Sequence, residues 1–451
     1  MLASYRALLP SGLSGATAAA GLLGLVVFAA RILHVEWLGP FVIPVVGVIA
    51  AVSFGNRCAR VHPDEPWLPR LILYGTLVKL SASYLRYVTL TQAYDGVGDA
   101  TRYDIEARKF VAAWAGDGVA PVMSDFRQTN FLKLMSGITY FLFGQSLLGA
   151  FLLFGLLAVI GSYFWFRAVA CALPNADKRL FLMFMMFVPS IVFWPSALGK
   201  EALMQVGVGA LAWGIGMLLT GQAGRPLPLI VGGGWLVWVV RPHLLALVAV
   251  AGAVPYFVGH IRQRAKGSFF TRPIGMAVIG VAVLLTVTTS AKFLGIERLS
   301  ISAIEEQLDE TTQQTSQGGS SYAGAGNSLN PLFLPLNVVT VLVRPLPWEA
   351  RSAFQLAAAA ESALLIGLIA RRFGSVQLAL RRVRLDPFVM FCVVLLILYA
   401  VLFSSLANFG LLSRQRSLAL PALYALIAVD PARLRRDDQA SDVPESVRPG
   451  G

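Results

Sequence analysis

Long apolar runs bounded by charged residues recur along most of the chain. Several of them reach the ~20 residues that a helix needs to cross a bilayer. The pattern predicts an all-α polytopic membrane protein with about 12 transmembrane helices, within roughly 10 to 13 because Pro and Gly interrupt several runs. The predicted spans are 12–33, 38–55, 71–91, 146–168, 180–194, 201–220, 227–240, 243–259, 274–290, 353–370, 387–406 and 417–430.

Basic residues follow the alternation of these spans. With the N-terminus in the cytoplasm, every predicted inner connection is basic, as the positive-inside rule requires. The alternation predicts one transmembrane domain, residues 1–430, with a disordered cytoplasmic tail, 431–451, and two long outer connections, 92–145 and 291–352. Both termini are then cytoplasmic. The basic residues of the inner connections are Arg57, Arg60, Arg70, Arg167, Lys178, Arg179, Arg225, Arg262, Arg264, Lys266, Arg272, Arg371, Arg372, Arg381, Arg382, Arg384, Arg433, Arg435 and Arg436.

The two outer connections differ in character. Residues 99–115 have the apolar spacing of an amphipathic helix, with Tyr103 on the apolar face, which predicts a juxtamembrane helix in the interface plane. Asp99 is predicted as its N-cap and Gly116 as its C-terminal stop. Residues 305–331 are rich in Ser, Gln and Gly and low in apolar residues, which predicts weak ordering and either a mobile flap or an acceptor-facing loop.

The composition agrees with a membrane protein. Of the 451 residues, 56% are hydrophobic and 14% are charged, whereas a soluble domain carries about 25% charged residues. The three cysteines, an odd number without motif spacing, argue against a disulfide framework and a zinc site. The formal charge of +13 does not indicate a nucleic-acid partner, because basic residues collect in the cytoplasmic loops of membrane proteins.

Two carboxylates stand in the turn before the predicted interface helix, within the stretch "YDGVGDATRYD" at 94–104. Asp99 is either only a helix cap, or a helix cap whose carboxylate also acts as a general base at the membrane surface. Asp95 is either a solvated loop acid or a second catalytic or metal-binding carboxylate. Asp104 is predicted to lie on the solvated face of the helix.

Basic residues also stand in other motifs on the predicted outer side. A helix is predicted to start near Ser196 with Lys200 and Glu201 in its first turn, and a lysine at a helix N-terminus forms an anion site unless it only pairs with Glu201 or extends to the interface. Arg241 and Arg344 lie on the side that the positive-inside rule disfavours. The candidates for binding a phosphate are Lys200, Arg241, Arg344, Arg414 and Arg416, with His243, Trp348 and Glu349 beside them.

Each of these motifs also has a simpler interpretation. Proline suits the first helical turn, so "WVVRPHLLAL" and "VLVRPLPWEA" are compatible with turn chemistry alone. Arg414 and Arg416 either bind interfacial lipid headgroups or complete a basic pocket. Glu361 lies inside a predicted span, so it is either a functional residue or one member of a buried pair with Lys79 or Arg86.

Acids and cations gathered on one side of a membrane suit a glycan donor linked to a polyprenyl phosphate or polyprenyl diphosphate. The phosphate of such a donor stays at headgroup level, where Lys and Arg stabilise the negative charge that grows on the leaving group. A carboxylate takes the proton of an acceptor hydroxyl during attack on the anomeric carbon, and direct displacement inverts that centre. No cofactor is then required, although Asp95 and Asp99 together could hold a divalent metal ion.

The stretches "GDATRY", "PS…WPSALGKEAL", "RPLPWE" and "NFGLLSRQR" resemble the bacterial integral-membrane GT-C-type glycosyltransferases and the related EpsG/Wzy-like polysaccharide polymerases. The resemblance implies a GT-C-like enzyme of the bacterial cytoplasmic (inner) membrane with its active site outside. Such an enzyme transfers a lipid-linked sugar to a glycan or lipid acceptor in cell-envelope polysaccharide or glycolipid assembly. The resemblance also implies Asp99 as the base, Asp95 beside it, and the five basic residues as the donor-phosphate site. The supporting residues are Tyr103, Glu201, His243, Trp348 and Glu349.

Two other classes of protein are compatible with similar charges. A lipid-linked oligosaccharide flippase or transporter would carry charges along its whole path, whereas the charges here gather on one side. A non-enzymatic assembly or scaffold protein would not need acids and cations together. Within the enzyme class, the sequence leaves a monosaccharide transferase and a repeat-unit polymerase undistinguished.

Overall fold

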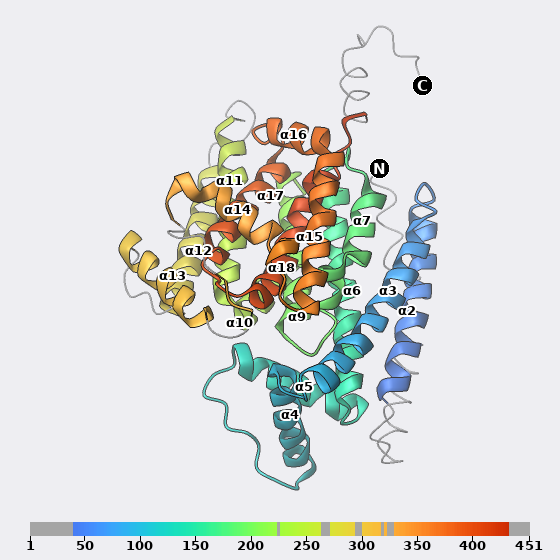
Figure 1. Ribbon diagram of the computed structural model, residues 1–451. Coiled ribbons are helices and arrows are strands. Elements are labelled where there is room, and N and C mark those ends of the chain that lie inside the picture. The colour runs from blue at the N-terminus through green and yellow to red at the C-terminus, as the bar shows by residue number, and fades with distance from the viewer. Residues whose placement is uncertain are drawn as a thin grey trace. The chain divides into compact units, whose positions relative to one another are not determined.

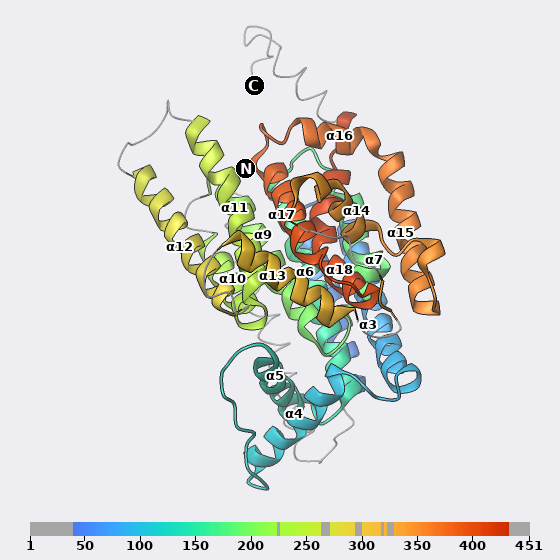
Figure 2. The same cartoon turned by 60° about the vertical axis from the view of Figure 1, so that its left-hand side comes forward.

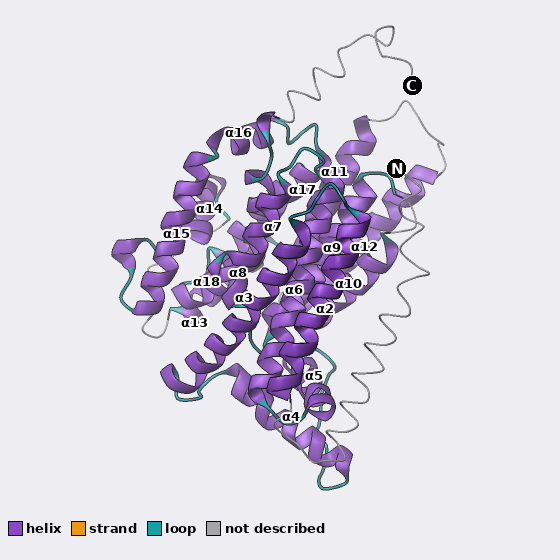
Figure 3. Ribbon diagram, turned by 90° about the vertical axis from the view of Figure 1, so that its right-hand side faces the viewer, coloured by secondary structure: helices purple, strands orange, loops and turns teal. Residues whose placement is uncertain are grey.

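The computed structural model describes residues 39–222, 226–262, 271–293, 300–316, 320–322 and 329–432. Within these ranges the regular elements are helices, and the extended pairing consists of two isolated bridges (Figures 1 and 3). The predicted all-α fold class is therefore confirmed for the described residues. The predicted first span, 12–33, and residues 433–451 of the predicted tail lie outside them. The longer helices are α2 (Gly39–Val61), α3 (Leu68–Val88), α4 (Asp99–Ala115), α5 (Gln128–Phe143), α6 (Leu147–Ala172), α7 (Lys178–Phe187), α9 (Lys200–Leu219), α10 (Leu227–Val240), α11 (Pro242–Arg262), α12 (Thr271–Phe293), α13 (Ile301–Thr315), α14 (Leu334–Val343), α15 (Ala353–Arg371), α16 (Phe373–Arg381), α17 (Pro387–Phe403) and α18 (Phe409–Ile427).

Four of the described helices are long and apolar enough to cross a membrane: α2, α6, α9 and α15. Several further apolar helices, among them α10 and α17, are shorter. The apolar helices indicate a membrane protein, as predicted, because a run of about 20 apolar residues matches the thickness of the hydrocarbon layer. The number of about 12 spans stays a prediction.

The chain forms two compact units. The first comprises residues up to 161 together with 192–206, and the second comprises 162–191 together with 207–451. We describe each unit by itself.

In the first unit, α2 packs against α3, and α4 packs against α5 (Figure 1). The α4–α5 contact is close because Gly137 lies on it, and a Cβ at this position would lie 2.9 Å from Cβ of Phe110. Helix α3 continues into one π-helical turn, Thr89–Ala93, immediately before the acidic stretch. The first unit thus holds the predicted interface helix and the turn that precedes it.

The predicted interface helix has the predicted bounds, Asp99–Ala115. Its apolar face is buried, Tyr103 included, and it ends at Gly116, whose φ of 91° is left-handed and favours glycine. The prediction of Asp99 as N-cap is wrong, because Gly98 is the N-cap and Asp99 is the first helical residue. The solvated position predicted for Asp104 is also wrong, since its carboxylate pairs with Arg108 at 3.1 Å and accepts a hydrogen bond from the Tyr140 hydroxyl of α5. Burial is the main cause that raises the pKa of Tyr140. The hydrogen bond to Asp104 and its negative charge raise it further, and the positive charge of Arg108 lowers it.

The core of the second unit surrounds α17 and α18. Helix α17 packs against α11, α14 and α18, and nearly every residue of α18 is buried. Both helices begin with a side-chain cap, Asp386 for α17 and Asn408 for α18, each accepting two backbone N–H groups. The connection between them, residues 404–408, is therefore held firmly at its α18 end.

The polar segment predicted as a weakly ordered flap is instead helical over its first part. Helix α13, Ile301–Thr315, starts with a hydrogen bond from the Ala303 amide to the Ser300 hydroxyl. Thr312 donates to the carbonyl of Ser405 at 2.9 Å, and the hydroxyl of Thr315 accepts from the amide of Ala407 at 2.9 Å. Hydroxyl side chains thus fasten this apolar-poor helix to the α17–α18 connection, which composition alone did not indicate.

Helix α15 ends where α16 begins, with Arg372 as the C-cap of the first and the N-cap of the second. Figures 1 and 2 both show α16 running across the direction of α15 and α17, at the end of the helical bundle in this unit. The chain therefore turns sharply as it leaves α15, and α16 lies crosswise.

Candidate functional site

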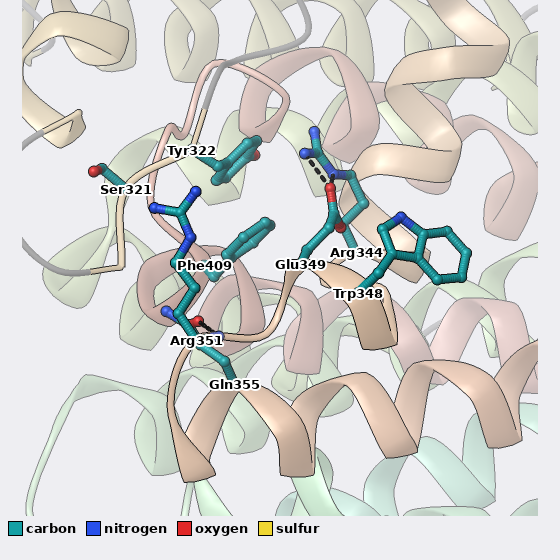
Figure 4. A pocket seen from close by; sticks show the side chains of 8 residues that line it. All are labelled: Ser321, Tyr322, Arg344, Trp348, Glu349, Arg351, Gln355 and Phe409. Atoms are coloured by element: carbon teal, nitrogen blue, oxygen red, sulfur yellow. Dashed lines mark hydrogen bonds and ion pairs between the residues drawn. The ribbon is translucent and has the colours of Figure 1, made fainter.

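The second unit has an open pocket of about 260 Å³ at the start of α15 (Figure 4). Its walls come from three stretches that are far apart in the sequence, residues 321–322, residues 344–355 and Phe409. The lining residues are Ser321, Tyr322, Arg344, Trp348, Glu349, Arg351, Gln355 and Phe409. Three of them, Arg344, Trp348 and Glu349, are predicted site residues.

An isolated antiparallel bridge between Ser321 and Asn408 joins the first wall of the pocket, Ser321 and Tyr322, to the start of α18. The amide of Tyr322 donates to Ala407 at 3.0 Å, and the amide of Phe409 donates to Ser320 at 2.9 Å, which makes an antiparallel bridge. The Tyr322 and Phe409 rings then stack with centroids 4.2 Å apart and an interplanar angle of 8°. The Tyr322 hydroxyl donates to the carbonyl of Leu406 at 2.5 Å. Backbone hydrogen bonds and ring stacking therefore both hold Tyr322 against Phe409.

Arg344 is clamped between an aromatic wall and an acid. Its guanidinium carbon lies 4.3 Å from the centre of the Tyr322 ring, and its Nε donates to Glu349 Oε1 at 2.8 Å. The other carboxylate oxygen of Glu349 accepts from the Leu346 amide at 2.8 Å. Burial alone would raise the pKa of Glu349, but the hydrogen bonds from Arg344 and Leu346, with the charge of Arg344, lower it below its ordinary value. Glu349 is therefore ionised at neutral pH and offsets the charge of Arg344.

Burial also controls the state of Tyr322. Burial raises the pKa of this phenol, the charge of Arg344 lowers it and the charge of Glu349 raises it, so that the pKa is about 12. The hydroxyl is therefore protonated at neutral pH and acts as the donor to Leu406. The wall presents a neutral ring to the pocket.

Arg351 is the cation of this pocket that no acid offsets. Within the described part of the chain its guanidinium makes no ion pair or hydrogen bond, and the side chain is exposed. Figure 4 shows it extending beside Tyr322 toward Ser321. Its backbone amide donates to the side chain of Gln355 at 2.6 Å, which fixes the start of α15 below it. The charges of Arg344 and Glu349 cancel each other. The lining residues therefore carry one net positive charge, that of Arg351.

Arg416 supports the pocket from within the bundle. It is 1% exposed and donates through Nη1 to the Ser362 hydroxyl at 2.8 Å and to the carbonyls of Leu342 and Arg344 at 3.3 Å each. A guanidinium that bridges two carbonyls holds the chain as it leaves α14 and enters the pocket. We therefore interpret Arg416 as a support for Arg344.

Glu361 completes this buried network. Its Oε1 lies 3.7 Å from Nη2 of Arg416, and its carboxylate accepts from the amide and the hydroxyl of Ser190, at 2.8 and 2.6 Å. Within the second unit the cation of Glu361 is Arg416, whereas Lys79 and Arg86, the cations considered for it from the sequence, belong to the first unit. The guanidinium of Arg86 lies over the rings of Phe193 and Trp194 instead, at 4.7 and 5.0 Å.

Arg241, at the end of α10, contacts α18, the helix that carries Arg416. It follows the last residue of α10, is 8% exposed, and donates through Nη1 to Gln415 at 2.8 Å. Gln415 stands between Arg414 and Arg416 on α18. The predicted cations Arg241, Arg344, Arg414 and Arg416 are thus brought to α18 or to the chain that it supports. His243 lies in the first turn of α11, two residues beyond Arg241.

The predicted acids lie in the first unit. Asp95 and Asp99 are both exposed, and Asp95 adopts a left-handed conformation with φ of 48°. The turn around them is held by hydrogen bonds from the Gly96 amide to Leu90 at 2.8 Å and from the Thr101 hydroxyl to Gly96 at 2.5 Å. Both carboxylates are therefore accessible on a turn of defined shape, and their catalytic roles stay predictions.

Lys200 and Glu201 also belong to the first unit. Helix α9 begins at Lys200 itself, four residues later than the predicted start at Ser196, because the chain from 194 to 199 is irregular. Lys200 is half-buried and Glu201 is buried. The lysine is thus at the helix N-terminus, as predicted, and its phosphate-binding role stays a prediction.

The sequence analysis missed Arg351, Tyr322 and Phe409. Arg351 could have been found, because it stands on the predicted outer side by the same rule that singled out Arg344 seven residues earlier. Tyr322 and Phe409 carried no such signal, since their stacking joins residues 87 positions apart. Among the residues that the structure describes, no group of three or more His, Cys, Asp or Glu side chains could hold a metal ion.

Comparisons with known proteins add no relative. No family model matches the chain, and no curated protein or solved structure matches it either. The function is therefore argued from the residues themselves.

Proposed function

We propose that the protein is an integral-membrane glycosyltransferase that uses a sugar or oligosaccharide donor linked to a polyprenyl phosphate or diphosphate. The proposal places it in the bacterial cytoplasmic membrane, with its active site outside, in the assembly of envelope polysaccharide or glycolipid. The observation that carries the proposal is the pocket at the start of α15, which combines the unpaired charge of Arg351 with the aromatic side chains of Tyr322, Phe409 and Trp348.

The position of the pocket on α15 suits a lipid-linked phosphate. Helix α15 has 19 residues and thus a length of about 29 Å, close to the ~30 Å of a hydrocarbon core. Only 22% of its apolar stretch is buried, so most of that stretch is available for contact with lipid. The pocket lies at its N-terminal end, which supports a location at headgroup level, where a polyprenyl donor keeps its phosphate.

The side chains of the pocket suit both parts of such a head group. An arginine donates charge-assisted hydrogen bonds to phosphate oxygens in a fixed planar geometry. Trp348 is 79% exposed and offers a free ring face to the apolar side of a sugar. Ser321 and Gln355 add groups that hydrogen-bond with sugar hydroxyls. The lining is thus mixed aromatic and polar, as small-molecule sites are.

In the proposed reaction an acceptor hydroxyl loses its proton to a carboxylate and attacks the anomeric carbon of the donor. The bond between this carbon and the phosphate oxygen breaks, and the phosphate leaves with the electron pair, which inverts the anomeric centre. Asp99 is proposed as the base, with Asp95 beside it, on the strength of their motif. Arginine at the phosphate stabilises the charge that develops there, so the proposal requires no metal ion.

A lipid-linked oligosaccharide flippase is the second candidate. The observation that favours it is the set of ionisable residues buried among the helices of the second unit, namely Arg241, Glu361 and Arg416. Ionisable groups at membrane depth often mark a transport path. The three residues bind one another or neighbouring protein groups here, which favours a supporting role.

Lipid-linked glycans from a strain that lacks the protein distinguish these functions. Loss of one sugar from the glycan is expected for a monosaccharide transferase. Loss of long chains with accumulation of single repeat units is expected for a polymerase. A complete lipid-linked unit that accumulates on the cytoplasmic side would contradict the enzyme proposal and support the flippase.

The Arg351→Gln variant is expected to bind a lipid phosphate about 10- to 100-fold more weakly, because a hydrogen bond to a charged group contributes about 1.5–3 kcal/mol. Calorimetric titration of the purified protein in detergent with farnesyl phosphate measures this change. Farnesol, which lacks the charge, should bind wild type and variant equally.

Arg179→Gln is the matched control, since it removes an exposed arginine of α7 in the same unit. Its affinity for farnesyl phosphate should equal that of the wild type. Equal losses in both variants, or none in Arg351→Gln, would show that the pocket does not bind the phosphate.

A further inference from the structure

Helix α16 and its flanks carry a dense positive charge without acids. The stretch 371–385, "RRFGSVQLALRRVRL", has five arginines, and the first acid after it is Asp386. The arginines stand at the two ends of the stretch, with bulky apolar residues between and beside them. Basic residues mixed with apolar ones on a short helix are typical of segments that lie on an anionic membrane surface.

The structure divides these residues between two faces of α16. Ser375 and Ala379 are buried, and this face packs against α18. The opposite face is exposed and carries both apolar and basic side chains. We call it the α16 face, and it consists of Arg371, Phe373, Gln377, Leu380, Arg381, Arg384 and Leu385.

The apolar side chains of the α16 face are largely exposed. Phe373 is 60% exposed, Leu380 48% and Leu385 66%. Arg371 and Arg381 make no side-chain hydrogen bond or ion pair among the described residues, whereas Arg372 lies 3.9 Å from Asp177. The guanidinium groups of Arg371 and Arg381 thus share one surface with exposed apolar side chains.

The course of the chain puts this face at the end of a membrane-length helix. Helix α15 is long enough to cross the hydrocarbon layer, and most of its surface is exposed. Helix α16 starts two residues after α15 ends and runs crosswise to it (Figures 1 and 2). Helix α16 is thus at the opposite end of α15 from the Arg351 pocket, where a spanning α15 would bring it to headgroup level.

We infer that the α16 face binds the headgroups of anionic phospholipids, with Phe373, Leu380 and Leu385 inserted at the acyl boundary and Arg371, Arg381 and Arg384 on the phosphates. Charge complementarity selects this occupant. A nucleic acid or an acidic protein would leave the apolar side chains exposed, whereas a lipid surface accommodates both kinds of residue. The inference is independent of the sugar-transfer proposal, since it involves the other end of α15.

Native mass spectrometry of the full-length protein with phosphatidylglycerol and phosphatidylcholine tests this inference. Each arginine near an anionic surface strengthens binding about fivefold, so Arg371→Gln/Arg381→Gln should lower phosphatidylglycerol affinity about 30-fold. Phosphatidylcholine binding should stay the same. Arg60→Gln/Arg70→Gln is the matched control for general electrostatics, because it removes two exposed arginines elsewhere and should lower phosphatidylglycerol affinity much less.

A second measurement locates the face directly. A fluorophore on the Gln377→Cys variant, in a background without the native cysteines, should be quenched in nanodiscs by lipids with a spin label near the headgroup. Equal losses of phosphatidylglycerol in the two double variants would overturn the inference, because general electrostatics would then explain the binding. Absence of quenching would also overturn it and indicate a protein partner for the α16 face.

Discussion

Cells that carry Asp99→Asn in place of the wild-type protein are expected to lose sugar transfer by about 10²- to 10⁴-fold, the usual contribution of a general base. The amide of asparagine cannot take a proton from an acceptor hydroxyl at neutral pH. The fold should be retained, because Asp99 is exposed and the N-cap of α4 is Gly98. The variant loses the favourable interaction of an acid with a helix N-terminus, about 0.3–1 kcal/mol. Lipid-linked glycans extracted from the cells, with the amount of inserted protein, provide the measurement.

Two variants with the same chemical change serve as controls. Asp117→Asn alters an exposed acid just beyond α4 and should leave transfer unchanged. Asp95→Asn preserves the turn, because asparagine tolerates the left-handed conformation that Asp95 adopts. It is expected to reduce transfer less than Asp99→Asn. Normal glycans from cells with Asp99→Asn would show that Asp99 only contributes to the helix start.

The Arg416→Met variant is expected to destabilise the second unit by about 3–5 kcal/mol, because it leaves the buried carboxylate of Glu361 without its cation. Arg416 is 1% exposed, so water cannot replace the lost partner. The carbonyls of Leu342 and Arg344 also lose their donor. In a Cys58→Ser/Cys171→Ser background, a thiol-reactive dye measures unfolding in this unit, since Cys392 of α17 is fully buried and becomes reactive only when the unit opens.

The double variant Glu361→Gln/Arg416→Met separates the charge from the contacts. Without a charge at either position, most of the stability should return, because a neutral pair avoids the desolvation of two ions. Binding of farnesyl phosphate should remain weaker than in the wild type, since nothing then bridges the carbonyls behind Arg344. A double variant as unstable as Arg416→Met would contradict the account of the ion pair. Full recovery of binding would contradict the role of Arg416 as a support.

Local sequence patterns predicted the bounds of a helix well where apolar spacing, apolar length or a single glycine determines those bounds. The spacing of apolar residues predicted α4 to the residue, and Gly116 ends it because glycine adopts the left-handed conformation easily. Charge and apolar length predicted α15 and α17 within a few residues. The same approach failed for α13, because its stability comes from hydroxyl groups of Thr312 and Thr315 that bond to a distant connection.

The candidate site was predictable only in part. Rules about charge at the membrane surface singled out Arg344 and, with consistent use, would have singled out Arg351. The partners of these residues were not accessible to such rules. Tyr322 is 22 positions from Arg344, and Glu361 pairs with Arg416 across 55 positions and with Ser190 across 171. Glu361 had two plausible cations in other spans, and a linear pattern carries no information on which of them is near.

The sequence by itself determined that the chain is helical and made for a membrane, because apolar run length and helical periodicity are local properties that each segment carries alone. It also determined which residue types are available for chemistry and roughly at which helix ends they stand. Only the tertiary structure decided which of them meet. Arg344 is offset by Glu349, Arg416 is enclosed as a support, and Arg351 keeps its charge exposed, because each outcome depends on packing between segments that are distant in the chain.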